Sequence, residues 1–171
     1  MIQTLDIFPQ KIGRFRYEGD LSLYVEEIYK IKSQTSNSVK YFPKSLQYQT
    51  PFNLFDKYSV FNPIKNTIKN LLENYYNLPL KIINSWANIY PKFGYTPFHS
   101  HQPSFSSGVL YLVTPPNDCL NIHNKNFPEH YQTIPVQNGD VLFFNGDQPH
   151  STYPNLSNKD KVIIAFNLIK V

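Results

Sequence analysis

The stretch from Leu80 to Tyr90 reads Leu-Lys-Ile-Ile-Asn-Ser-Trp-Ala-Asn-Ile-Tyr, and from here the sequence alternates with a period of two. Alternation of this kind is typical of β-strands, in which neighbouring side chains point to opposite faces. Turn residues such as proline, asparagine, aspartate and glycine separate five runs of this kind. The runs are Leu80–Tyr90, Ser107–Val113, Leu120–His123, Val141–Asn145 and Val162–Val171. Short strands at this spacing predict a β-sandwich or barrel.

The first 79 residues predict helices. Asn62-Pro63 is a typical helix start, with asparagine as the cap and proline in the first turn. A stripe of apolar residues follows at helical spacing and comprises Ile64, Ile68, Leu71, Leu72 and Tyr75. The sequence Asn77-Leu78-Pro79 ends this helix. Asp20 is predicted to cap an earlier helix, which carries Leu21, Val25, Ile28 and Tyr29. Both helices should pack on one outer face of the β part, and residues 33–53 predict an irregular connection.

The composition fits one domain and disfavours several classes of protein. The chain has 171 residues, of which 41% are hydrophobic, so it can bury a core. No apolar run approaches the roughly 18 residues of a membrane span, and the first residues lack a secretory signal. Cys119 is the only cysteine, which excludes an internal disulfide and a cysteine-based zinc site. We therefore expect a cytoplasmic protein without a membrane partner.

The distribution of charge limits the choice of partners and of anion-binding residues. The net charge is +4, but the basic residues are scattered, so nucleic acid is not indicated. The only arginines are Arg14 and Arg16. An anion anchor in the β part must therefore be a lysine, a histidine or a set of backbone amides.

Three of the five histidines stand in a pattern that suits a metal ion. His99 and His101 flank one serine, and on a strand residues i and i+2 point to the same side. His150 follows 49 residues after His101, and a neighbouring strand can bring it to the same point. Imidazole suits iron, zinc, copper and nickel, and three protein ligands leave positions open for a substrate. A lone His-x-His pair is a weak signal, and His123 and His130 are expected to be solvated in a polar loop.

Further motifs accompany these histidines in a definite order. They are Trp86-Ala87-Asn88, Tyr90-Pro91-Lys92-Phe93-Gly94, Ser107-Gly108-Val109, Gly139-Asp140-Val141-Leu142-Phe143 and Lys161–Asn167. Together with His99, His101 and His150 they resemble the small 2-oxoglutarate/Fe(II)-dependent oxygenases of bacteria and marine phages. The Tyr-Pro-x-x-Gly segment, the following histidines and Tyr111-Leu112 also resemble the prolyl hydroxylases. The resemblance covers nearly the whole chain.

The resemblance implies a fold, a reaction and a set of site residues. The fold is a double-stranded β-helix, a cupin-like jelly roll, with residues 80–171 as its core and residues 1–79 as a helical part of the same domain. Iron(II) is held by His99, His101 and His150. The cosubstrate 2-oxoglutarate is bound by Lys161, Tyr111, Tyr90, Asn88 and Asn167. The implied activity is hydroxylation of an unidentified substrate with release of succinate and carbon dioxide.

The sequence departs from the usual family pattern at two positions. His101 stands where a carboxylate ligand is usual, so either three histidines bind the metal or a carboxylate comes from elsewhere, with Asp147 nearest to His150. Lys161 stands where an arginine is usual, and Lys159 is its rival. Lysine offers a point charge in place of a bidentate fork. Alternation favours Lys161, because it shares a face with Ile163, Ala165 and Asn167, while the opposite face is apolar.

Two other functions remain open from the sequence. One is a cupin-type dioxygenase that holds iron with three histidines and needs no cosubstrate. The other is a non-catalytic jelly-roll module that binds or builds a structure. The substrate, a small molecule or a peptide, is not legible, a homodimer is possible, and the expected compartment is the cytoplasm of a bacterium or of a phage-infected host.

Overall fold

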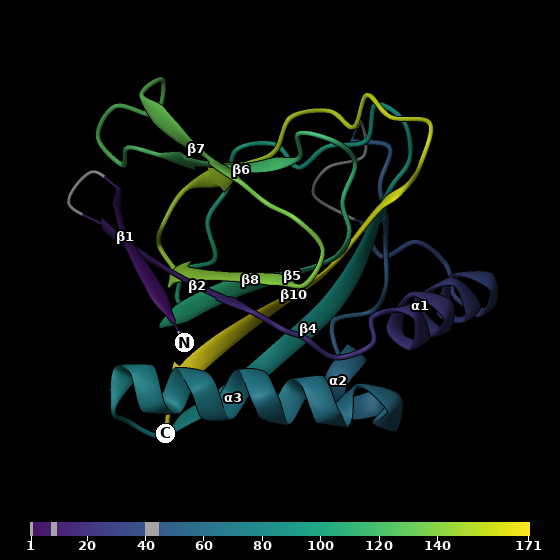
Figure 1. The fold of residues 1–171 in the computed structure, drawn as a ribbon, viewed down its shortest axis with the longest axis horizontal. Coiled ribbons are helices and arrows are strands. Elements are labelled where there is room, and N and C mark those ends of the chain that lie inside the picture. The colour runs from purple at the N-terminus through teal and green to yellow at the C-terminus, as the bar shows by residue number, and fades with distance from the viewer. Residues whose placement is uncertain (1, 8–9, 40–44) are drawn as a thin grey trace.

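The computed structural model describes residues 2–7, 10–39 and 45–171, and its strands form two sheets that face each other (Figure 1). Paired neighbours within each sheet are antiparallel. The large sheet has the order β1 (Gln3–Ile7), β2 (Gln10–Arg16), β8 (Asp140–Asn145), β5 (Ser106–Val113), β10 (Lys161–Lys170), β4 (Leu80–Tyr90) and β3 (Tyr48–Gln49). The small sheet has the order β7 (Tyr131–Pro135), β6 (Cys119–His123) and β9 (His150–Ser151).

The five predicted strands are confirmed as β4, β5, β6, β8 and β10, with ends that differ by one residue at most. The longest pairing joins β10 to β4, from Lys161 opposite Tyr90 to Lys170 opposite Leu80. A register shift after Asn167 interrupts this pairing once. Residues that lie opposite each other on β4 and β10 point to the same face of the large sheet, and successive residues alternate between its two faces.

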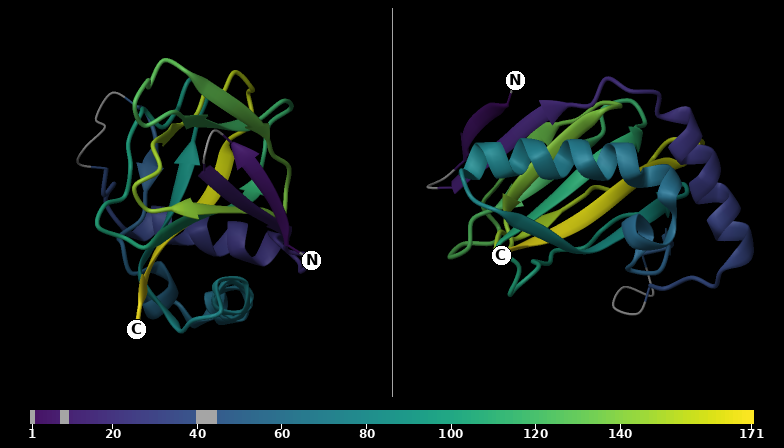
Figure 2. Two further views of the ribbon diagram at one scale, coloured as in Figure 1. Left: turned by 90° about the vertical axis from the view of Figure 1, so that its left-hand side faces the viewer. Right: turned by 90° about the horizontal axis from the view of Figure 1, so that it is seen from below.

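Three α-helices, α1 (Ser22–Gln34), α2 (Leu54–Lys57) and α3 (Asn62–Tyr76), lie on one side of the large sheet (Figure 2). The prediction for α3 is confirmed, with Pro63 in the first turn and Ile64, Ile68 and Leu72 buried. Asn77 ends it in the left-handed conformation, at φ 52°. None of the helices in the described part of the chain is long and apolar enough to cross a membrane.

The first helix is confirmed, but its buried stripe differs from the prediction. Its buried residues are Tyr24, Ile28 and Ile31, whereas Tyr29 is exposed. Asp20 accepts hydrogen bonds from the backbone N–H of Ser22 at 2.9 Å and from its hydroxyl at 2.7 Å. The carboxylate therefore sits at the start of α1, as expected, although Leu21 occupies the formal cap position.

The expectation that residues 1–79 are helical is wrong for Gln3–Ile7 and Gln10–Arg16, where β1 and β2 form the edge of the large sheet. β2 pairs with β8, and its side chains alternate, so that Ile12 packs between the sheets and Phe15 packs toward the helices. Arg14 and Arg16 both donate to the buried carboxylate of Asp140 on β8. This strand escapes a search for alternation because Arg14 and Arg16 share a face with Ile12, so that this face does not read as apolar in the sequence.

The large sheet separates two hydrophobic cores. The core between the sheet and the helices takes Val162, Ile164, Phe166 and Leu168 from β10, together with the stripe of α3. The core between the two sheets takes Ile163 and Ala165 from β10, and residues of β6 and β8. The predicted apolar face of Val162–Leu168 is therefore confirmed as the face that packs on the helices. The opposite face points into the space between the sheets.

Candidate metal centre and its cavity

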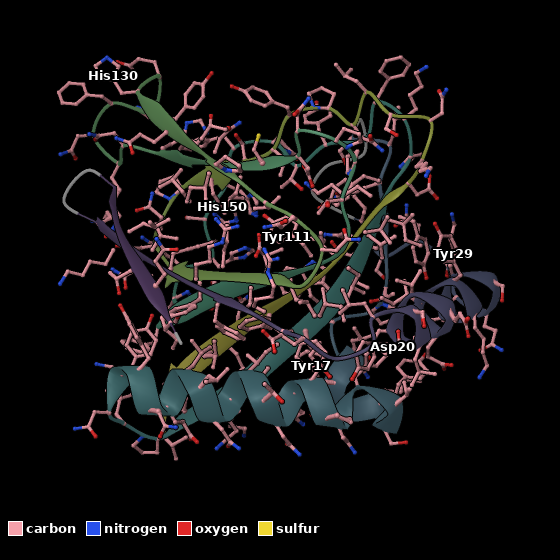
Figure 3. All side chains as sticks on the ribbon, viewed as in Figure 1. Tyr17, Asp20, Tyr29, Tyr111, His130 and His150 are labelled. Atoms are coloured by element: carbon pink, nitrogen blue, oxygen red, sulfur yellow. The ribbon has the colours of Figure 1, made fainter. Side chains whose placement is uncertain are left out.

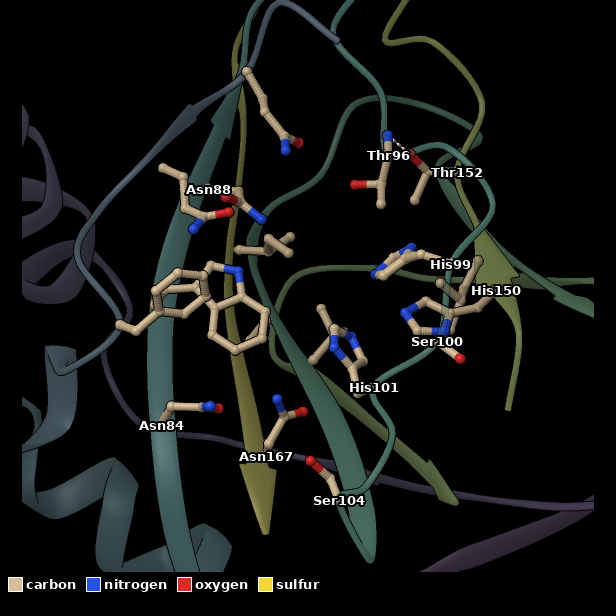
Figure 4. A pocket seen from close by; sticks show the side chains of 18 of the residues that line it. Asn84, Asn88, Thr96, His99, Ser100, His101, Ser104, His150, Thr152 and Asn167 are labelled. Atoms are coloured by element: carbon tan, nitrogen blue, oxygen red, sulfur yellow. Dashed lines mark hydrogen bonds between the residues drawn. The ribbon is translucent and has the colours of Figure 1, made fainter. Parts of the chain in front are cut away.

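The space between the sheets holds a cavity of about 760 Å³ that collects the residues singled out in the sequence (Figure 4). Side chains of β4, β5 and β10 form its floor, and the segment 96–104 and residues 47–52 form its walls. His150 and Tyr111 lie between the sheets, on the far side of the large sheet from α3 (Figure 3). The predicted site residues that line it are His99, His101, His150, Lys161, Tyr111, Tyr90, Asn88 and Asn167.

Three histidines converge at one end of this cavity. His99, His101 and His150 each offer a ring nitrogen, and these atoms lie within 4.8 Å of one another. The backbone fixes the approach, because the N–H of His99 donates to the carbonyl of His150 at 3.1 Å and the reverse bond measures 2.9 Å. His101 follows two residues later and points to the same side, as the spacing predicted. A cation bound at the centre of this cluster would meet three nitrogen ligands.

The ring orientations are fixed by backbone carbonyls. The Nδ1 atom of His150 lies 2.9 Å from the carbonyl oxygen of Gln148, and that of His99 lies 2.9 Å from the carbonyl oxygen of Pro97. A carbonyl oxygen only accepts, so the Nδ1 atom of His150 carries the proton and its Nε2 atom carries the lone pair. Metal-binding histidines generally show such a partner on the nitrogen that does not bind the metal.

The histidines are neutral at physiological pH. Burial lowers the pKa of His101 to about 3, and the neighbouring His99 contributes to that shift. Burial lowers the pKa of His99 as well, and it lowers the pKa of His150 well below its ordinary value, with His99 and His101 contributing. Neutral imidazole is the form that binds metals, and it can be buried without a counter-ion. The cluster therefore fits a divalent transition metal in its donor type, geometry and protonation state.

No carboxylate among the described residues joins the three histidines. Asp147, the nearest candidate in the sequence, is partly exposed and accepts a hydrogen bond from Lys125 at 2.6 Å. Asp140 is held by the two arginines of β2. Asp118 pairs with Lys161. The structure thus brings His101 into the cluster and leaves each of these three carboxylates with another partner.

The predicted anchor Lys161 is buried and reaches into the cavity. Its Nζ atom lies 5.3 Å from the ring centroid of Tyr111 and 5.6 Å from that of Tyr90. Lys159, the rival anchor, is exposed on the loop before β10. Burial lowers the pKa of Lys161, and the carboxylate of Asp118 opposes this shift. Lys161 is therefore the lysine of the two that a ligand in the cavity would meet.

Asp118 is a site residue that the sequence did not reveal. Its Oδ1 atom accepts a hydrogen bond from the ammonium group of Lys161 at 2.7 Å, and both side chains are buried, with exposures of 8% and 4%. Asp118 stands in the turn Pro115-Pro116-Asn117-Asp118, where aspartate is common for local reasons. Only the tertiary fold, which lays this turn beside the start of β10, shows that the residue has a partner.

Several buried polar atoms around Lys161 are only partly satisfied. Asn88 donates from Nδ2 to the Tyr90 hydroxyl at 3.0 Å, and that hydroxyl lies 2.7 Å from Oγ1 of Thr96. The amide oxygen of Asn88 and the hydroxyl of Tyr111 have no partner in the described structure. A buried polar group without a partner costs roughly 1–3 kcal/mol. Asn88 and Tyr111 therefore mark positions where a bound ligand would supply hydrogen bonds.

Asn167 has a structural partner inside the cavity. Its Oδ1 atom accepts a hydrogen bond from the hydroxyl of Ser107 at 2.7 Å, which ties β10 to β5. This is the partner that a buried asparagine requires even without a ligand. Asn167 lines the cavity beside Ala165, and its amide nitrogen is the group left to face a ligand.

The wall opposite the histidines was largely missed in the sequence. Trp86 packs edge to face on Phe52 at 5.1 Å between ring centroids and lies 5.6 Å from the ring of His101. Gln47 and Gln49, on the segment around β3, line the same cavity. The strand β3 has only two residues, too few to show an alternation in the sequence. This wall could therefore not be predicted.

The expectation that His123 is solvated in a loop is wrong. His123 ends β6, its Nδ1 atom lies 2.6 Å from the carbonyl oxygen of Pro128, and its Nε2 atom lies 2.8 Å from the hydroxyl of Ser151. These contacts join the small sheet to the loop that follows β6. His130 is exposed on that loop, as expected.

By sequence, no family model and no curated protein matches the chain. Solved structures do match it closely in shape. The non-heme alpha-ketoglutarate-dependent epimerase SnoN from nogalamycin biosynthesis superposes with a TM-score of 0.76 at 12% identity, over 93% of this chain and 77% of that one. A prolyl-4-hydroxylase of Pseudomonas putida gives a TM-score of 0.70 at 12% identity, over 94% and 92%. HygX of Streptomyces hygroscopicus, solved with nickel and 2-oxoglutarate bound, gives a TM-score of 0.70 at 13% identity, over 94% of this chain and 82% of that one.

The chain has the fold of the 2-oxoglutarate-dependent oxygenases. The predicted double-stranded β-helix with helices on one outer face is therefore confirmed. At these identities the likeness concerns the fold alone, and function must be argued from the residues of the cavity.

Proposed function

We propose that the chain is an Fe(II)- and 2-oxoglutarate-dependent dioxygenase that hydroxylates a small molecule or a peptide. The observation that carries this proposal is that one cavity has both parts of such a site. Three neutral histidines converge at one place, and a buried lysine beside two tyrosines lines the same cavity. The fold is shared with HygX, whose structure contains nickel and 2-oxoglutarate.

Different residues of the cavity would bind the metal, bind the cosubstrate and exclude water. His99, His101 and His150 would hold the iron, which supplies oxygen activation coupled to conversion of 2-oxoglutarate into succinate and carbon dioxide. Lys161 and the hydroxyl of Tyr111 bind the far end of the cosubstrate. Trp86 and Phe52 cover the cavity opposite the histidines and exclude water from it.

A second function is favoured by a specific observation, namely that the described metal cluster consists of histidines alone. Iron held by three histidines also suits a cupin-type dioxygenase that needs no cosubstrate. Such an enzyme has no use for a buried cation in its cavity. Lys161 is therefore the residue on which the two functions differ.

An anaerobic titration with Fe(II), followed by 2-oxoglutarate, tests the proposal. Chelation of the metal by the 2-oxo acid gives a visible charge-transfer band. We expect this band in the wild-type protein, its loss in His150→Ala and its weakening in Lys161→Ala. His130→Ala is the matched control, because His130 is exposed and lies outside the cavity.

The outcomes separate the functions. Iron binding without a band, whatever the cosubstrate concentration, would favour the three-histidine dioxygenase. Failure to bind stoichiometric Fe(II) would leave a jelly-roll module whose histidines have a structural role. Where the charge-transfer band is seen, succinate release in the presence of oxygen is the second readout for the cosubstrate-dependent enzyme.

A further inference from the structure

The anchor end of the cavity holds an ion pair rather than a free cation. The Nζ atom of Lys161 lies 2.7 Å from Oδ1 of Asp118, and that oxygen also accepts the backbone N–H of Cys119 at 2.9 Å. Both side chains are more than nine-tenths buried. Lys161 lines the cavity and Asp118 does not, so the carboxylate contacts the ammonium group from outside the cavity.

This pairing changes what the anchor can recognise. Among the described residues that line the cavity, Lys161 is the only lysine, arginine, aspartate or glutamate. Its charge is paired with that of Asp118, so a carboxylate that enters meets attraction from Lys161 and, from the more distant Asp118, a repulsion that offsets part of this attraction. The net electrostatic preference for an anion at this end is therefore smaller than that of an unpaired lysine.

The hydrogen-bonding groups at this end are of both kinds. Lys161 and the unpartnered hydroxyl of Tyr111 can donate, whereas the unpartnered amide oxygen of Asn88 can only accept. Asn88 belongs to this end, because its Nδ2 atom bonds the hydroxyl of Tyr90, whose ring lies beside Lys161. A carboxylate accepts only and leaves Asn88 without a donor. A carboxamide offers an oxygen to Lys161 and Tyr111, and an N–H group to Asn88.

The metal end differs in charge from the anchor end. Three histidines bind a metal as neutral imidazoles and leave the full charge of a divalent ion uncompensated, whereas a carboxylate ligand would have removed one unit. The positive charge of the loaded site therefore lies at the metal, where the 2-oxo acid group binds. The far end is neutral and both donates and accepts hydrogen bonds.

We propose that Asp118 sets the cosubstrate specificity of this site, so that a 2-oxo acid with an uncharged carboxamide end binds about as well as 2-oxoglutarate. The inference rests on the proposed function, because it assumes that a 2-oxo acid binds the metal. Asp118 acts through Lys161 and is a positioning residue that does not itself touch the cosubstrate.

Two inert analogues test the proposal by binding alone. N-oxalylglycine has the length and both carboxylates of 2-oxoglutarate, and N-oxalylglycinamide differs only in a carboxamide at the far end. Their dissociation constants are measured anaerobically on the Fe(II)-loaded protein, by displacement of the 2-oxoglutarate band or by calorimetry. In the wild-type protein we expect the two constants to agree within about threefold.

The variant Asp118→Asn keeps the shape of the side chain and removes its charge. We expect it to shift the ratio of the two constants by at least tenfold in favour of the dianion, because Lys161 then lacks its counter-ion. Lys161→Gln should abolish this shift when it is combined with Asp118→Asn. A purely structural role for Asp118 would weaken both analogues alike and leave the ratio unchanged.

Three outcomes decide the matter. Equal binding in the wild-type protein together with a shifted ratio in Asp118→Asn supports the proposal. A wild-type preference of more than about threefold for the dianion, or an unchanged ratio in the variant, overturns it while the proposed function stands. If neither analogue binds to protein that has taken up Fe(II), the proposed function fails, and this inference fails with it.

Discussion

The two faces of the large sheet are both buried but differ in chemistry, and β10 shows this within one strand. Toward the helices it presents Val162, Ile164, Phe166 and Leu168, all at most 1% exposed. Toward the cavity it presents Lys161, Ile163, Ala165 and Asn167, which are 3% to 6% exposed. The first face is apolar throughout, whereas the second buries a charge and an amide.

The comparison shows which face the fold depends on and which face serves a ligand. Apolar burial against the helices is favourable for every residue that takes part. On the cavity face, Asn88 and Tyr111 bury polar atoms that have no partner in the described structure. Such atoms reduce stability, and they are explained when a ligand completes them. Substitutions on the two faces should therefore affect different measurements.

The largest effect on stability is expected for Phe166→Ala on the helix face. Phe166 is fully buried and fills the space beside Gly108, where a Cβ atom would lie 2.3 Å from its ring. Truncation of a buried phenylalanine costs about 3–5 kcal/mol. Urea unfolding should show this loss, while the Fe(II) affinity of the folded variant stays within threefold of the wild-type value. The exposed Phe127 provides the control Phe127→Ala, with an expected change below about 0.5 kcal/mol. Loss of metal affinity in folded Phe166→Ala would show that the two faces are not independent.

The largest effect on binding is expected for His150→Ala on the cavity face. Removing one of three ligands should weaken Fe(II) binding by more than 100-fold, since even loss of a residue that only orients a ligand costs about 10- to 100-fold. Calorimetry under anaerobic conditions measures this change. The unfolding free energy of the metal-free variant should change less than that of Phe166→Ala. A variant that binds iron normally would remove His150 from the metal centre.

The pH dependence of the unfolding free energy distinguishes the two faces, because only the cavity face carries the buried histidines of the cluster. In the metal-free protein, burial holds the pKa of His101 at about 3 and lowers the pKa of His99 and His150 as well. Unfolded histidines titrate near 6.5, so between these values the unfolded state takes up protons that the native state does not. Stability is therefore full above pH about 6.5 and falls as the pH decreases, by up to about 1.4 kcal/mol per pH unit for each histidine.

Urea unfolding between pH 7.5 and pH 5 measures this slope. Phe166→Ala should lower the whole curve without changing its slope below pH 6.5. His150→Ala should give a shallower slope, because one buried histidine is gone. Parallel curves for His150→Ala and the wild-type protein would show that His150 is not the source of the proton linkage.

The sequence predicted both faces of β10 and the three histidines, because these features repeat at short range. Period two in Lys161–Asn167 separates the polar side chains from the apolar ones. His99 and His101 converge as predicted, although they lie in a loop with an isolated bridge at His99 and not in a strand. Asp118 and Gln47 could not be predicted in this way. Gln47 reaches the cavity, and Asp118 reaches Lys161, through contacts between segments far apart in the chain, and neither belongs to a run long enough to show a period. The edge strand β2 escaped for a similar reason, since Arg14 and Arg16 hide its alternation.

The smallest expected change in stability is that of Tyr111→Phe, and it is the most informative about the cavity face. The hydroxyl of Tyr111 is buried and has no partner in the described structure, so its removal breaks no hydrogen bond. The unfolding free energy should stay within about 1 kcal/mol of the wild-type value or rise slightly, because a buried polar group is lost. The affinity of the Fe(II)-loaded protein for 2-oxoglutarate should fall roughly 2- to 10-fold, as expected for one neutral hydrogen bond.

Tyr90→Phe is the matched control. The hydroxyl of Tyr90 forms hydrogen bonds with Asn88 and Thr96, so Tyr90→Phe, unlike Tyr111→Phe, should lower the free energy of unfolding. If Tyr111→Phe destabilises the protein as Tyr90→Phe does and leaves cosubstrate binding unchanged, the hydroxyl of Tyr111 has a partner within the protein, and the distinction between the two faces does not hold at this residue.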